Sequence, residues 1–209
     1  MAQPKELTPR ARAKRDQIRE GAQRVFLERG FAGTSTDAIA SEAGVSKQTL
    51  YAYYASKEEL LVAVMQHLIH EDPQNRIPTA DELSFGTSDE VRRSLSSLGE
   101  ALVANLMQPD YLALIRVVIA ETPRLPQLGP LFRSALPERV LANVSAILEG
   151  AQRGGVIGTA DRETASRMFV GALLTYAVYD GLLVGDRLPQ PPTLERIEAV
   201  VDLFMKAIF

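Results

Sequence analysis

Seven side chains between residues 36 and 57 can donate hydrogen bonds from closely spaced positions, and they are the best candidates for chemistry in this 209-residue sequence. The set comprises Thr36, Lys47, Gln48, Thr49, Tyr51, Tyr53 and Lys57. Hydroxyl, amide and ammonium donors suit base edges and phosphate oxygens when one narrow element presents them together. The pattern therefore indicates recognition of a polyanion by hydrogen bonding, without a covalent step.

An enzyme is the alternative class, and few residues are available for it. The sequence has no cysteine, which excludes disulfides, thiolate metal sites and a cysteine nucleophile. The two histidines, His67 and His70, stand three residues apart beside Glu71 and Asp72, a spacing at which two ligands can share a metal. The cluster ends a predicted helix, however, where the helix dipole also favours imidazoles. We therefore expect no catalytic residue, no metal site and no cofactor.

The net charge of −3 is unevenly distributed along the chain. Residues 1–57 hold ten Lys or Arg and six Asp or Glu, whereas residues 58–209 hold thirteen and twenty. A basic quarter joined to an acidic remainder indicates a nucleic-acid-binding module, the alternative being chance clustering. The first 25 residues lack an apolar leader, and the longest apolar stretch, 168–179, is too short for a membrane span. We therefore expect a cytoplasmic protein.

Two short helices separated by a tight turn are predicted to position the donor side chains. Capping residues at 34–37 precede an apolar pattern that ends at Gly44, and Ser46 can cap a second helix two residues later. Ala40 is small enough for a helix crossing, Gly44 tolerates a positive φ, and Leu50 is placed to pin the second helix. These offsets predict a helix-turn-helix, the alternative being a helical hairpin used only for packing.

Apolar periodicity predicts helices in the rest of the chain, and no segment alternates with the period of a strand. The expected fold class is all-α, with an N-terminal arm and three-helix DNA-binding domain over 1–55, a connecting helix over 56–72 and a helical C-terminal bundle over 73–209. The first helix is predicted at 9–29, and those of the bundle at 91–107, 109–121, 127–134, 137–153, 161–184 and 194–208.

Five short motifs resemble the signature of the TetR family of repressors. They are GFAGTST at 30–36, IA at 39–40, AGVS at 43–46, TLY at 49–51 and SKEELL at 56–61. The resemblance covers about residues 15–65, and the stretch 111–133 is similar more narrowly to the AefR-type C-terminal domain. Tyr54 is a departure, because the family usually has Phe there. We assign its ring to the domain core, with its hydroxyl bonded or at the surface.

The resemblance implies a homodimer whose recognition helices enter successive major grooves of a pseudo-palindromic operator in double-stranded DNA. It implies a small-molecule effector in the C-terminal domain, and a repressor that a small, largely apolar inducer releases. The DNA contacts that it implies are Lys47, Gln48, Thr49, Tyr51 and Tyr53, with Thr36 and Lys57 on phosphate. The basic N-terminal residues either add phosphate or minor-groove contacts or form a solvated, partly disordered arm; they are Lys5, Arg10, Arg12, Lys14 and Arg15.

Two helices of the C-terminal part are more apolar than one face of a bundle requires, which indicates a two-fold, four-helix dimer interface. The interface residues that we expect are Val140, Val144, Ile147, Leu148, Phe169, Leu173 and Tyr176. The alternative is that both are core helices of a monomer.

A cavity for the effector is expected between helices, with mostly apolar walls and a few polar anchors. The candidates are Phe85, Met107, Tyr111, Arg116, Glu121, Phe132, Tyr176 and Tyr179. Arg116 stands in the apolar run 114–118, so its charge needs an anionic ligand or a buried partner such as Glu121. A helical adaptor that binds DNA without a ligand response is the third class.

Overall fold

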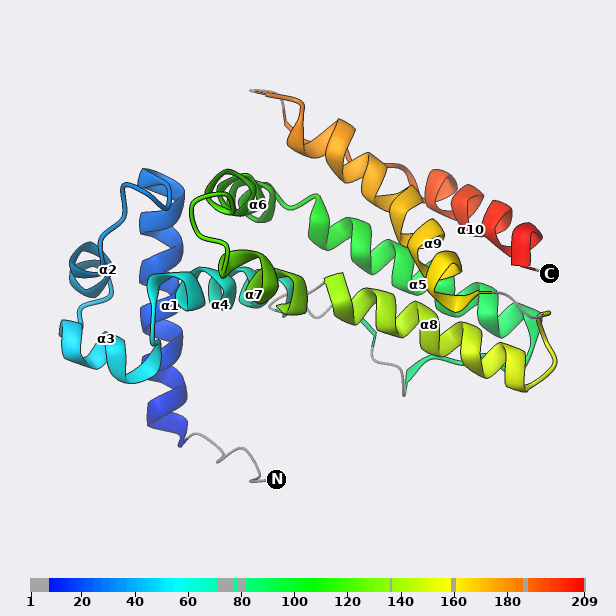
Figure 1. Ribbon diagram of the computed structural model, residues 1–209, viewed down its shortest axis with the longest axis horizontal. Coiled ribbons are helices and arrows are strands. Elements are labelled where there is room, and N and C mark those ends of the chain that lie inside the picture. Colours follow the sequence, from blue (N-terminus) through cyan, green and yellow to red (C-terminus); the bar gives the residue numbers. More distant parts are fainter. Residues whose placement is uncertain are drawn as a thin grey trace.

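The computed structural model describes residues 8–70, 77–78, 82–135, 137–158, 161–185 and 188–208. Within these residues the elements are helices and there is no strand, which confirms the all-α class (Figure 1). In chain order they are α1 (Pro9–Arg29), α2 (Thr36–Glu42), α3 (Lys47–Tyr53), α4 (Lys57–His70), α5 (Ser88–Leu106), α6 (Pro109–Glu121), α7 (Leu128–Ala135), α8 (Pro137–Arg153), α9 (Arg162–Tyr176), the π-helix η2 (Ala177–Leu182) and α10 (Leu194–Ile208). The observed bounds of α1, α6, α8 and α10 equal the predicted ones.

Helices α1 to α4 pack around one apolar core at the left of Figure 1. Phe26 of α1, Ile39 of α2 and Leu50 of α3 are each at most 1% exposed, and burying such a side chain contributes about 2 kcal/mol. Gly21 allows α1 to approach the end of α2, because a Cβ at this position would lie 2.9 Å from the Ala43 backbone. The α2–α3 pair is thus fixed to α1 by close packing.

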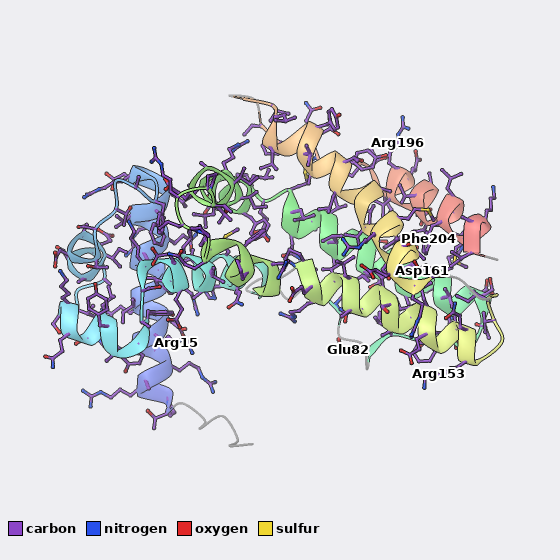
Figure 2. The ribbon with its side chains drawn as sticks, in the orientation of Figure 1. Arg15, Glu82, Arg153, Asp161, Arg196 and Phe204 are labelled. Atoms are coloured by element: carbon purple, nitrogen blue, oxygen red, sulfur yellow. The ribbon has the colours of Figure 1, made fainter. Side chains whose placement is uncertain are left out.

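Helices α5, α8, α9 and α10 form the bundle at the right of Figure 1. Helix α9 packs against the other three, and α10 lies on α5 and α9. Phe169 of α9 and Phe204 of α10 have ring centroids 5.1 Å apart, and Figure 2 marks Phe204 on α10. Among the described helices, none alone has the length and apolarity to cross a membrane; α5 and α6 meet those criteria only as a pair bent by 74°.

Helices α6 and α7 lie between the N-terminal helices and the bundle (Figure 1). Helix α7 packs along α4, and α6 contacts both α1 and α4. The Gln23 side-chain amide of α1 donates a hydrogen bond to Asp110 Oδ2 of α6 at 3.1 Å. Because α4 packs on α1 as well as on α6 and α7, the division of the chain at residues 55 and 72 stays a prediction.

The helix predicted at 161–184 is an α-helix only to Tyr176, where α9 passes into the π-helix η2 (Ala177–Leu182). The Leu183 N–H bonds to the carbonyl of Val178, five residues earlier, at 3.0 Å. Gly181 faces α6 at close range: a Cβ there would lie 3.1 Å from Leu112 Cδ1 and from Met107 Sδ. Widened turns of this kind occur often at functional sites, and η2 lies beside the cavity described below.

Candidate nucleic-acid interface and ligand cavity

Helix α3 presents the predicted DNA-contacting side chains at the protein surface. Ser46 caps the helix, since its Oγ accepts a hydrogen bond from the Thr49 N–H at 3.0 Å. Leu50 is fully buried and holds α3 in the core of the N-terminal domain. The predicted contacts are exposed at Lys47, Gln48 and Tyr51 and half-buried at Thr36, Thr49 and Tyr53. Lys47, Gln48 and Tyr51 share the exposed face of α3, whereas Tyr53 packs against the apolar core. The contact of all six residues with DNA stays a prediction.

Two side-chain contacts connect the first turn of α2 to this surface. The Tyr51 hydroxyl of α3 donates a hydrogen bond to Thr36 Oγ1 at 3.4 Å, and Lys47 Nζ lies 3.0 Å from Asp37 Oδ2. The bond to Asp37 raises the pKa of Lys47, so this side chain is cationic at neutral pH. Asp37 was not among the predicted site residues. The acidic residue in the first turn of α2 was visible in the sequence, but its pairing with α3 required the geometry of the turn.

Lys57 is predicted to contact phosphate, but its ammonium is already hydrogen-bonded within the protein. Its ammonium donates hydrogen bonds to the carbonyls of Phe31 at 2.7 Å and Thr34 at 2.8 Å, and it lies 4.1 Å from the centroid of the Phe31 ring. Burial lowers the pKa of Lys57. The residue therefore holds the α1–α2 loop in place. At most one N–H remains for a phosphate, and that contact stays a prediction.

The basic side of α1 packs partly against α4 and partly faces solvent. The Arg15 guanidinium lies 5.3 Å from the centroid of the Tyr54 ring, and Figure 2 marks Arg15 on α1. Tyr54 is 1% exposed and its hydroxyl donates to the Arg15 carbonyl at 3.5 Å, which confirms its assignment to the domain core. Arg10 and Arg12 are exposed. Lys5 lies outside the described residues.

His67 belongs to this α1–α4 contact. Arg19 Nη2 lies 3.0 Å from His67 Nε2 and 2.9 Å from Asp16 Oδ1. A guanidinium only donates, so His67 Nε2 is the acceptor in this contact. Glu71 and Asp72 of the predicted cluster lie outside the described residues. Among the residues that are described, no group of three or more His, Asp or Glu is placed to hold a metal ion.

A cavity of about 380 Å³ lies between α5, α6, α7, α8, α9 and η2. Of the predicted ligand residues, Tyr111 and Phe132 line it. Apolar side chains of α6, among them Ile115 and Ile119, form part of the wall. The described lining comprises Leu102, Leu106, Tyr111, Leu112, Ile115, Ile119, Phe132, Pro137, Val140, Leu141, Arg167, Val170, Gly171, Leu174, Ala177, Val178 and Leu182. Its size and composition suit a small, largely apolar molecule.

Arg116 was predicted to line the cavity, but it is not among the lining residues. Its guanidinium donates to the carbonyl of Gly181 at 2.9 Å through Nη2 and to that of Leu182 at 3.2 Å through Nε. Neither Glu121 nor the cavity holds this charge; the cation binds the last carbonyls of η2, where the helix dipole favours it. Burial lowers the pKa of the Lys57 ammonium, and the charges of Glu58 and then Glu121 oppose this effect.

The other four predicted ligand residues also lie outside the cavity lining. Phe85 packs on α8 at Gly150, where a Cβ would lie 2.2 Å from its ring. Met107 is buried beside Gly181, Tyr176 is half-buried, and Tyr179 is 70% exposed. The sequence indicated mostly apolar and aromatic candidates for a cavity between helices, but it could not show which helices enclose the cavity.

The predicted dimer residues, apart from the half-buried Tyr176, are buried inside a single chain, which contradicts the predicted interface. Val140, Val144, Ile147, Leu148, Phe169 and Leu173 are each at most 1% exposed. They form the bundle core, so they offer no surface to a second copy. The exposed apolar side chains of α9 and α10 are different ones, with Met168 49% and Leu203 68% exposed. They border a shallow groove of about 200 Å³ that also includes Ala172, Val200 and Ala207.

Comparison with known proteins matches both parts of the chain. Residues 18–64 match the family described as bacterial regulatory proteins, tetR family, and residues 93–207 match the AefR-like transcriptional repressor, C-terminal domain. An uncharacterized HTH-type transcriptional regulator of Bacillus subtilis, YvaF, is 35% identical over 79 residues, which are 38% of this chain and 41% of that protein.

Two solved structures resemble the whole chain. The Flavonoid-responsive Regulator FrrA is 30% identical with a TM-score of 0.71, and the alignment covers 94% of this chain and 97% of that one. A putative TetR-family transcriptional regulator from Mesorhizobium loti is 28% identical with a TM-score of 0.71 and 96% coverage of both chains.

Proposed function

Since the chain belongs to the TetR family of transcriptional regulators and its C-terminal domain is AefR-like, we propose that it is a repressor that a small molecule releases from its operator. The observation that carries this proposal is the donor surface of α3, which Ser46 and Leu50 hold in place next to the first turn of α2. Repression itself is supported by the description of the matched C-terminal family.

The proposed DNA complex has one recognition helix in each of two successive major grooves, about 34 Å apart. In this complex we expect the exposed Lys47 and Gln48 side chains to contact base edges, and Thr36 and Tyr51 to contact phosphate. The test is the affinity of the purified protein for the DNA upstream of its own gene, measured by fluorescence anisotropy at several salt concentrations. Specific binding must exceed that to a scrambled duplex of equal length; equal affinity for the two duplexes contradicts the proposal.

The proposed homodimer forms through the groove between α9 and α10, because the α8 and α9 residues predicted for the interface are buried in the bundle core apart from Tyr176. Exposed Met168 and Leu203 are large apolar side chains that a second copy related by a two-fold axis would bury. The groove lies in the bundle, away from α3, so a dimer formed there leaves both recognition helices free (Figure 1).

The effector is proposed to enter the 380 Å³ cavity. Helix α6 supports this role, because its apolar side chains line the cavity while its first turn bonds to α1 through Gln23 and Asp110. A relative that is 30% identical is named for a response to flavonoids, which makes flavonoids the first compounds to try. The test is release of the operator, together with a rise in the melting temperature of the DNA-free protein. A compound that releases DNA without raising that temperature acts elsewhere.

A further inference from the structure

The cavity has one uncharged polar side chain among its described lining residues, the phenol of Tyr111. This side chain is 1% exposed, and within the described part of the chain its hydroxyl has no hydrogen-bond partner. Burying a hydroxyl without a partner costs free energy, and native proteins seldom do so. The hydroxyl of Tyr111 is therefore an unmet hydrogen-bonding group at the wall of an otherwise apolar space.

The only charge in the described lining is that of Arg167, and it is already paired. Its Nε and Nη2 lie 3.1 and 3.0 Å from Glu163 Oε1, and the two side chains are 67% and 75% exposed. Arg167 is thus a residue of the solvent side of the cavity. An anion or cation placed deeper would lose its hydration without gaining a counterion.

We propose that the effector is a neutral, largely apolar molecule with a carbonyl or hydroxyl oxygen that hydrogen-bonds to the Tyr111 hydroxyl. The inference rests on the proposed function of the cavity as the effector site. A phenol both donates and accepts, so either kind of oxygen gives it a partner. The side chains of Leu106, Ile115 and Val178 bury the rest of the molecule.

Three probes that share the naphthalene ring system separate the contributions of apolar burial, the hydrogen bond and charge. They are naphthalene, 2-naphthol and 2-naphthoate. Their fluorescence reports binding to the full-length protein without DNA, and the chain has no tryptophan that would interfere. We expect 2-naphthol to bind about tenfold tighter than naphthalene, as one hydrogen bond in a dry site allows, and 2-naphthoate to bind more weakly than 2-naphthol. Tyr111→Phe should bring the ratio of naphthol to naphthalene affinity to about one and leave naphthalene binding unchanged.

The matched control is Tyr179→Phe, which removes a hydroxyl from a residue that is 70% exposed and outside the cavity lining. It should keep the tenfold ratio. Tyr111→Phe should melt at or above the wild-type temperature at neutral pH, because it removes no described hydrogen bond. A lower melting temperature would assign Tyr111 a structural role and overturn the proposal.

Three binding results overturn it as well: an unchanged ratio in Tyr111→Phe, preference for 2-naphthoate, or no saturable binding of any probe by the wild type. Operator binding is measured separately, without probes. Failure of the wild type to bind DNA therefore counts against the proposed function, whereas the probe ratios concern only the chemistry of the cavity.

Discussion

The Lys47 ammonium lies 3.0 Å from the Asp37 carboxylate and joins the first turn of α3 to the first turn of α2. The two side chains are 50% and 70% exposed, so the ion pair is at the surface that we propose for DNA. A carboxylate there repels phosphates of any sequence while it orients the lysine. We therefore expect Asp37 to limit nonspecific binding and to orient the Lys47 side chain.

Asp37→Asn should therefore increase affinity for all DNA and reduce the preference for the operator. It removes one negative charge next to the phosphates, so the plot of log affinity against log salt should become steeper by about one. The measurement is anisotropy with operator and scrambled duplexes over a range of salt. Asp89→Asn, the same change in exposed charge at the start of α5, is the control and should alter neither slope. Equal slopes for wild type and Asp37→Asn would place Asp37 outside the DNA interface.

Lys57→Met should destabilise the protein, because it leaves the Phe31 and Thr34 carbonyls without their ammonium donor. The methionine keeps the apolar stem, so the expected loss is that of the hydrogen bonds, about 2 kcal/mol in the free energy of unfolding. Urea denaturation measures it. The control, Lys47→Met, breaks only a surface ion pair and should leave stability nearly unchanged. If Lys57→Met is as stable as the wild type and loses only DNA affinity, the residue is a phosphate contact after all.

Most helix bounds could be predicted because the signals that set them are local. Ser46, Gly44 and the apolar spacing around Leu50 act within one or two turns, and the resulting α2–turn–α3 unit agrees with the prediction. Burial within a helix was also predictable. The surface that covers an apolar stripe was not predictable, because the stripe can pack against its own chain or against a second copy. Val144 is buried within the chain, whereas Leu203 is exposed.

The cavity was less predictable because its residues depend on contacts between distant segments. Arg116 needed a partner, and the sequence offered Glu121, but the carbonyls that it binds are 65 and 66 residues away. Those carbonyls are free acceptors because they belong to the last turn of η2, and the sequence carried no local signal for the change from α9 into η2. Of the eight residues predicted for a mostly apolar cavity between helices, Tyr111 and Phe132 line it.

Tyr111→Phe should also flatten the alkaline loss of stability. Burial raises the pKa of the Tyr111 phenol above its ordinary value of 10.0, so the folded state keeps this proton where the unfolded state releases it. Stability is fully present below pH 10 and falls as the pH rises toward the folded pKa, by up to about 1.4 kcal/mol per pH unit from this group. Urea unfolding of both proteins between pH 8 and 11 measures the difference. Parallel curves would mean that the phenol ionises within the fold.

Leu203→Glu should convert the proposed dimer into a monomer. The side chain is 68% exposed on α10 and borders the apolar α9–α10 groove, so a carboxylate there would be buried without a counterion when two copies meet. Light scattering after size exclusion should show the 22.9 kDa mass of one chain, and operator affinity should fall because the two half-sites are no longer bound together. Lys206→Gln shifts the net charge by the same amount on the same helix, outside the groove, and should remain dimeric. A dimeric Leu203→Glu protein would move the interface to another face of the bundle.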